Sequence, residues 1–333
     1  MKPTTTLAAR FTVAIALTIS IAGPTIADTE SATNRAFRAQ VTQFVEAELQ
    51  LYPERATALG DHRFDNRVDD VSAQGIDAVI HHAKKWIASF GADDGRNLSP
   101  ANEADREWLI SHLDGELLWT QQIRGYQRDP ETYLPTSSVN ALIKREFAPA
   151  EIRMRSVTAR EVGALKNLDA ARANLQPSLT PKVYVDIALQ QMPATIGFFN
   201  NDVPLAFAKV ADGPDKQAFA KANANLIAAI QDYAQWLKSE LMPKASGDYA
   251  VGAVAYRRML NDSDMVYMPL DQLEQVGVKE LARLRDEFQK TAAQVDPKRS
   301  PAEVMESLTR EHSRVRHRAS YRHNPVGRVA DGA

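Results

Sequence analysis

The chain has 333 residues, of which 44% are hydrophobic and 25% are charged, and its formal net charge at pH 7 is −2. This composition supports one large or two ordinary domains with a hydrophobic core, and it excludes an intrinsically disordered chain. The nearly neutral charge excludes a generally basic nucleic-acid-binding protein, so we expect no nucleic-acid partner. Because cysteine is absent, disulfides, thiolate metal ligands and thiol nucleophiles are excluded as well.

The amino terminus has the pattern of a secretory signal peptide. Lys2 and Arg10 precede an apolar run from Phe11 to Ala22, and Thr25 and Ala27 are small residues at the positions that signal peptidase reads. We predict cleavage after Ala27 and a periplasmic or secreted protein with no membrane span once the signal is removed. A short uncleaved anchor is the alternative. A lipoprotein anchor is not expected, because no cysteine follows the apolar run.

The sequence after Asp28 predicts an all-α fold, an irregular multi-helix array with at most one small β-hairpin. Apolar residues recur at helical spacing from about Thr33 to Leu51 and from Ile76 to Phe90, so each of these segments should bury one face. Residues 249–254 and 264–268 are the two strand candidates.

Proline and glycine mark several predicted helix ends. Pro53 suits the first turn of a short helix, which Gly60 then closes in the left-handed conformation. Ser99-Pro100 combines an N-cap with a proline at the first helical position, and Ser300 to Glu303 forms a capping box. By contrast, Pro193 should kink or end the helix that starts after Pro181, since an interior proline loses a hydrogen bond and clashes with the preceding turn.

The predicted helical domain spans residues 28–309. After Leu308 the apolar repeat stops, and residues 310–333 contain arginine and histidine but no lysine. We interpret residues 310–333 as a disordered or out-of-frame tail, with a native basic tail that binds an anionic surface as the alternative. Its histidines, His312, His317 and His323, would bind nickel or zinc only by chance.

The charged cluster in the segment Leu51 to Phe64 is the strongest candidate for a binding site. Asp61, His62 and Arg63 follow Gly60 directly, and together with Tyr256 and Arg257 they are predicted to line a cleft. An arginine there would bind a carboxylate bidentately, as a peptide carboxyl terminus requires, so peptide is the expected partner. The structural alternative is an interhelix salt-bridge cluster with no ligand.

No other pattern predicts catalysis or metal binding. The chain contains no His-Glu-x-x-His sequence, and the neighbours His81 and His82 point about 100° apart on a helix, so we predict no metal ligand and no bound cofactor. His82 is instead expected at the edge of a core face. No Gly-x-Ser-x-Gly elbow or phosphate-binding glycine loop occurs. Acidic pairs such as Asp169 near Glu161 are interpreted as solvated helix faces.

Several stretches, taken together and in order, resemble the bacterial domain of unknown function 885 family. Tyr52-Pro53-Glu54 and Leu59-Gly60-Asp61-His62-Arg63-Phe64 resemble its amino-terminal signature. Weaker matches occur at Glu151 to Arg155, at Gly247 to Leu260 and from Pro269 to Leu281. The resemblance covers nearly all of residues 30–309. This part of the chain is similar to the amino-terminal half of the family.

The resemblance implies a secreted, helical, zinc-peptidase-like protein. The family's metal motif, of the type His-Glu-x-x-x-Gly-His-His, lies in its second half and does not occur in this sequence. We therefore expect an exported helical protein that resembles the front half of a zinc-dependent peptidase and is catalytically inactive as it stands, with zinc implied only for longer relatives. A self-sufficient helical binding module of the cell envelope is the alternative. The first hypothesis predicts exposed apolar surface, and the second predicts a compact, cooperatively unfolding protein.

Overall fold

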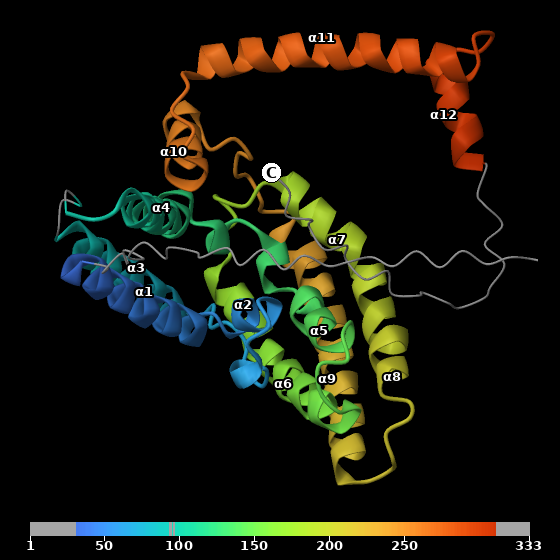
Figure 1. The fold of residues 1–333 in the computed structure, drawn as a ribbon. Coiled ribbons are helices and arrows are strands. Elements are labelled where there is room, and N and C mark those ends of the chain that lie inside the picture. Colours follow the sequence, from blue (N-terminus) through green and yellow to red (C-terminus); the bar gives the residue numbers. More distant parts are fainter. Residues whose placement is uncertain (1–30, 93–94, 96, 311–333) are drawn as a thin grey trace, which may run out of the picture. The chain divides into compact units, whose positions relative to one another are not determined.

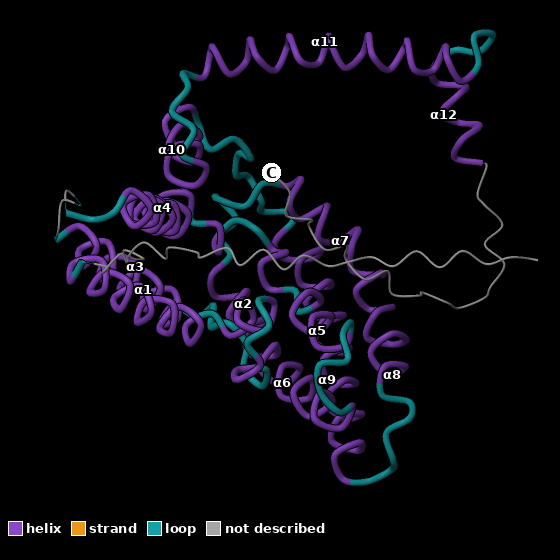
Figure 2. Tube along the Cα trace, in the orientation of Figure 1, coloured by secondary structure: helices purple, strands orange, loops and turns teal. Residues whose placement is uncertain are grey.

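The computed structural model describes residues 31–92, 95 and 97–310, and every regular element among these residues is helical (Figures 1 and 2). The all-α prediction is confirmed. Neither strand candidate, residues 249–254 or 264–268, forms a strand. The predicted signal peptide lies outside the described residues, as does the predicted tail apart from Arg310. None of the described helices is long and apolar enough to cross a membrane.

The described residues form two units, which divide after Ser263. The α-helices of the first unit, the last of which ends one residue beyond the division, are α1 (Ala32–Leu51), α2 (Pro53–Ala58), α3 (Ala73–Gly91), α4 (Pro100–Leu117), α5 (Thr136–Ile143), α6 (Ala150–Asn174), α7 (Lys182–Gly197), α8 (Val203–Ala206), α9 (Pro214–Trp236) and α10 (Ala253–Asp264). The second unit contains α11 (Leu270–Val295) and α12 (Pro301–Arg310).

The first unit has two main hydrophobic clusters. One joins α1, α3 and α4 and is rich in aromatic rings, among them Phe44, Trp86 and Phe90. The larger one lies among α5 to α9, and its most extensive helix contact is between α6 and α9. The segment from Leu51 to Val71 joins α1 to α3, and Val71 at its end packs against the larger cluster.

Helix ends follow the local signals in the sequence. Pro53 opens α2, and Gly60 has a φ of 91°, as the predicted left-handed stop requires. At α4, Ser99 Oγ accepts a hydrogen bond from the Asn102 N–H at 3.3 Å. At α12, the Glu303 carboxylate accepts from the Ser300 N–H at 2.7 Å, which completes the predicted capping box.

Pro193 does not end its helix, which was one of the two outcomes expected of it. Helix α7 continues through Pro193 to Gly197, and a π-helical turn, Phe198–Asp202, follows it. A proline removes only one backbone hydrogen bond, and the buried residues Val185, Met192 and Thr195 hold both sides of α7 against the core. Tertiary packing therefore outweighs the local preference.

The second unit is a pair of helices with little buried surface. Ala292 of α11 and Val304 of α12 are its buried apolar residues. Val276, Leu284 and Phe288 on α11 are each about half exposed.

Candidate functional site

A cavity of about 630 Å³ lies in the first unit where the end of α1, the start of α3, the end of α4 and α10 meet. Its apolar wall includes Val68, Ile76 and Trp119, and Met259 lies on the α10 side. Cavities of this size and lining bind small molecules or short segments of peptide. None of the five residues that the sequence predicts as a binding site lines this cavity.

Two glycines allow the cavity wall to close. A Cβ atom on Gly75 would lie 1.9 Å from the Asp70 carbonyl oxygen. Only glycine at this position therefore lets the backbone of Asp70 pack against the first turn of α3. A Cβ atom on Gly125 would lie 2.5 Å from the Trp119 ring. These close approaches position Asp70 and Trp119 on the wall.

Three acidic residues, Asp69, Asp70 and Glu116, line the cavity together with the polar residues Arg67 and His112. Burial, and then the nearby charge of Glu54, raise the pKa of Asp69 to about 7, although the Glu54 N–H donates to Asp69 Oδ1 at 3.0 Å. Asp69 therefore changes its charge near neutral pH. A cation that enters the cavity would stabilise the ionised form of Asp69.

Glu48 and Glu116 anchor a polar cluster between α1 and α4. Tyr52 Oη donates to both carboxylate oxygens of Glu116 at 2.8 Å. His82 Nε2 lies 2.8 Å from Glu48 Oε2, and Arg55 forms an ion pair with Glu48 Oε1. Burial by itself would raise the pKa of Glu48, but the two neighbouring histidines and Arg55 lower it to about 2.

His112 completes this cluster from α4. Its Nε2 atom lies 3.9 Å from Glu48 Oε1. Its ring stacks on Trp108, with centroids 5.3 Å apart and planes 5° from parallel. One ligand atom each from Glu48, His112 and Glu116 lie within 4.8 Å of one another. The cluster has the donor types of a metal centre. Its carboxylates also pair with the histidines and Arg55 of the cluster, as in a structural ion-pair network.

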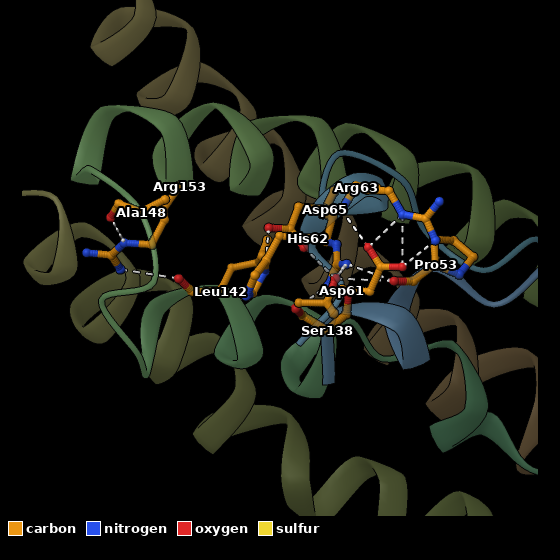
Figure 3. A network of polar contacts seen from close by, with 11 residues as sticks. Pro53, Asp61, His62, Arg63, Asp65, Ser138, Leu142, Ala148 and Arg153 are labelled. Atoms are coloured by element: carbon orange, nitrogen blue, oxygen red, sulfur yellow. Dashed lines mark hydrogen bonds and ion pairs between the residues drawn. The ribbon is translucent and has the colours of Figure 1, made fainter. Parts of the chain in front are cut away.

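A second network surrounds the fully buried guanidinium of Arg160 on α6. Arg160 Nη1 donates to the Ser138 carbonyl oxygen at 2.7 Å, and its Nη2 donates to Thr57 Oγ1 and the Pro53 carbonyl oxygen. Thr57 Oγ1 lies 2.6 Å from Asp65 Oδ1. Figure 3 shows Pro53, Asp65 and Ser138 in this network. It joins α2, α5 and α6.

The residues of the sequence-predicted cleft take structural positions. Asp61 caps the 3-10 turn His62–Phe64, and Arg63 binds both Asp61 and, at 2.8 Å, Glu46 on α1. The His62 ring stacks on Phe147 at a centroid distance of 3.6 Å. His62 Nδ1 lies 3.0 Å from an oxygen of Asp65 (Figure 3). These contacts agree with the salt-bridge alternative.

Tyr256 and Arg257 lie on α10, and both are exposed. Among the described residues, no hydrogen bond or ion pair joins either of them to Asp61, His62 or Arg63. The five residues of the predicted cleft therefore lie at two separate places, the 3-10 turn and α10, and no direct polar contact between described residues joins the two groups.

The interpretation of Glu161 as a solvated residue is wrong. Its side chain on α6 is fully buried, and neither carboxylate oxygen has a hydrogen-bond partner among the described residues. Burial raises its pKa to about 8, so it is largely protonated at neutral pH. Asp169 is exposed as predicted. Helix α6 is covered on several sides, so its charged residues do not all face water.

His82 lies where the sequence places it, at the edge of a core face against Phe44 and Trp86. The Glu48, His112 and Glu116 cluster was not predicted. Its one local signal is the spacing of His112 and Glu116, which are four residues apart and therefore share a face of α4. Glu48 gives no such signal, because only tertiary packing brings α1 to α4.

One solved structure similar to this chain is that of a proposed lipoprotein of unknown function from Shewanella oneidensis. The TM-score is 0.68 at 21% sequence identity, and the match covers 79% of this chain and 48% of that chain. This chain thus spans about half the length of that protein, and the similarity establishes the fold. Comparison with curated proteins gives no match.

The family model described as a bacterial protein of unknown function, DUF885, matches residues 53–328. The match begins at Pro53, in the segment whose motifs carried the resemblance, and includes the residues of the Arg160 network. Because it covers well over half of the sequence, the chain belongs to the DUF885 family of bacterial proteins.

Proposed function

We propose that this chain is an exported helical protein that binds peptides by their free amino terminus, in the cavity bounded by α1, α3, α4 and α10. The observation that carries this proposal is the cavity wall, where Asp69, Asp70 and Glu116 accompany an apolar lining. A peptide whose first residue is apolar carries a positive amino group next to an apolar side chain, and this wall complements both. Export is supported by the signal-peptide pattern before Asp28 and by the description of the similar structure as a proposed lipoprotein.

The charge balance at the wall favours an ammonium group over a carboxylate. Arg67 is engaged, because its Nη2 donates to the Gln50 carbonyl oxygen at 3.0 Å. The Asp69 carboxylate accepts only one hydrogen bond among the described residues, from the Glu54 N–H. It therefore keeps capacity to accept from a cation, as does the Asp70 carboxylate, whose Oδ1 accepts from the Ser72 N–H at 2.9 Å. The sequence predicted that an arginine binds the peptide carboxyl terminus. We propose instead that the carboxylate of Asp69 binds the peptide amino terminus.

The proposed function does not include hydrolysis. The family resemblance implies a zinc motif of the type His-Glu-x-x-x-Gly-His-His, and this sequence contains none. The four histidines among the described residues, His62, His81, His82 and His112, include no pair separated by four residues, so they do not fit that motif. We propose that the chain supplies peptide recognition in a peptidase-like fold, and we expect bound peptides to remain intact.

Removing either partner of the proposed ion pair should weaken binding. We expect Asp69→Asn, or acetylation of the peptide amino group, to lower the affinity roughly 10- to 100-fold, since a hydrogen bond to a charged group contributes about 1.5–3 kcal/mol. The measurement is calorimetric titration with a short apolar peptide at about pH 7.5, which lies between the pKa of Asp69, about 7, and that of an α-amino group, about 7.7–8.0.

Combining Asp69→Asn with the acetylated peptide distinguishes the contact between Asp69 and the amino group from a general loss of binding. If Asp69 binds the amino group, acetylation should have little further effect in Asp69→Asn, and the two effects will not add. Asp186→Asn on the exposed side of α7 makes the same change in net charge and is expected to bind like the unmodified chain. Equal affinity for free and acetylated peptides in the unmodified chain would refute the proposal.

A further inference from the structure

We propose that Glu48, His112 and Glu116 form a binding site for one divalent transition-metal ion such as Zn²⁺. The site would take one carboxylate oxygen from each glutamate and Nε2 from His112, a donor set of the kind that binds zinc. Three protein ligands leave a fourth position open. The inference rests on this geometry. Because His112 and Glu116 also line the cavity proposed for peptides, it is tested with Zn²⁺ alone, in the absence of peptide.

The ligand atoms already converge from two helices. His112 and Glu116 share one face of α4, and Glu48 faces them from α1. Ligands of one tetrahedral zinc ion lie roughly 3.3 Å apart, given metal–ligand distances of about 2.0–2.1 Å. His112 Nε2 is 3.9 Å from Glu48 Oε1, and all three atoms lie within 4.8 Å. Small side-chain rotations therefore bring them to one ion.

A supporting shell orients both carboxylates. His82 holds the Oε2 atom of Glu48 at 2.8 Å, which leaves Oε1 directed toward His112. Tyr52 Oη holds Glu116 at 2.8 Å, and the Trp108 ring fixes the plane of His112 by stacking. Outer partners of this kind are typical of metal centres, because they fix the ligand atoms before the ion binds.

Arg55 occupies the position that the proposed cation would take. It pairs with Glu48 Oε1 and approaches Glu116 Oε1 at 3.6 Å, so its guanidinium bridges two of the three proposed ligands. Its side chain is 40% exposed, whereas that of Glu48 is 9% exposed. Arg55 can therefore swing into solvent when a metal ion replaces it, and it competes with the ion until then.

The site is open to cavities on two sides. His112 lines the large cavity and also a second cavity of about 500 Å³, which Glu48 and Trp108 line with it. An ion has an entry path, and water or another small ligand has room at the open position. A purely structural ion pair does not need this access.

The test is calorimetric titration of Zn²⁺ alone into the full chain with the tail substitutions H312A, H317A and H323A. These substitutions remove binding by the tail histidines. We expect one Zn²⁺ per chain. His112→Gln or Glu116→Gln should each weaken binding by at least 10- to 100-fold, because that range is typical for loss of a supporting residue and these two residues are ligands. His81→Gln is the control, because His81 is exposed and adjacent to the supporting residue His82. This variant should bind Zn²⁺ as tightly as the unmodified chain.

The arginine variant distinguishes a metal site from an ion-pair cluster. Because Arg55 competes with the ion, Arg55→Gln should bind Zn²⁺ about tenfold more tightly, although it removes an ion pair. Co²⁺ titrated into the same variant should give visible absorption bands that His112→Gln lacks. Loss of all zinc binding with the tail substitutions, or binding unaffected by His112→Gln and Arg55→Gln, would overturn the proposal.

Discussion

Replacing Arg160 with methionine is expected to lower the free energy of unfolding by about 3–5 kcal/mol, because it leaves buried charges without their partner. The charges of Glu54, Asp65 and Asp69 all act on the Arg160 guanidinium and oppose the lowering of its pKa by burial. Its donors also satisfy the Ser138 carbonyl oxygen and Thr57 Oγ1. Urea denaturation followed by circular dichroism measures the change.

The matched control for this prediction lies on the same helix. Arg172 of α6 pairs with Asp232 at 2.6 Å, but the Asp232 side chain is 75% exposed. Arg172→Met should therefore cost at most about 1 kcal/mol. If the two variants lost equal stability, the Arg160 network would not be the link between α2, α5 and α6 that the structure indicates.

Replacing Glu161 with glutamine is expected to stabilise the protein at alkaline pH and to leave it unchanged near pH 4.5. The unfolded chain ionises Glu161 at its ordinary pKa of 4.5, whereas the folded chain holds the proton until about pH 8. Stability contributed by this group is thus complete below pH 4.5 and is lost as the pH rises to about 8. The loss amounts to roughly 4–5 kcal/mol.

Urea denaturation at a series of pH values tests the Glu161 prediction. The difference between Glu161→Gln and the unmodified chain should grow from near zero at about pH 4.5 to its full value at about pH 8. Burial also raises the pKa values of Asp69 and Glu54. Their effects on the free energy of unfolding are the same in both proteins, so they cancel when one curve of stability against pH is subtracted from the other. The exposed Glu151→Gln on the same helix is the control, and a difference that does not vary with pH would contradict the burial of a neutral Glu161.

Local signals predicted the helices well because they act within a few residues. The proline of α2, Ser99 before α4 and the Ser300 capping box each determine an end without help from the rest of the chain. Pro193 shows the limit of this reasoning, since core contacts on both sides carry α7 past it. The π-helical turn after α7 also depends on packing, and no local pattern predicts it.

The candidate site depends on contacts that sequence spacing does not show. Glu48 and His112 are ordinary residues in two amphipathic segments until α1 packs against α4. Glu161 and Arg160 are adjacent charged residues on α6, and their burial follows from the elements that surround this helix. Conversely, the cluster of Asp61, His62 and Arg63 is conspicuous in sequence, yet its contacts cap a turn and join it to α1 and Phe147.

The most direct test of peptide recognition is anomalous diffraction from crystals grown with a short peptide whose first residue is para-bromophenylalanine with a free amino group. The proposal predicts a bromine peak inside the cavity lined by Ile76 and Trp119, with the peptide nitrogen within hydrogen-bonding distance of Asp69. Peptide bound with its bromine on the outer surface, or no bromine peak at a saturating peptide concentration, would contradict it.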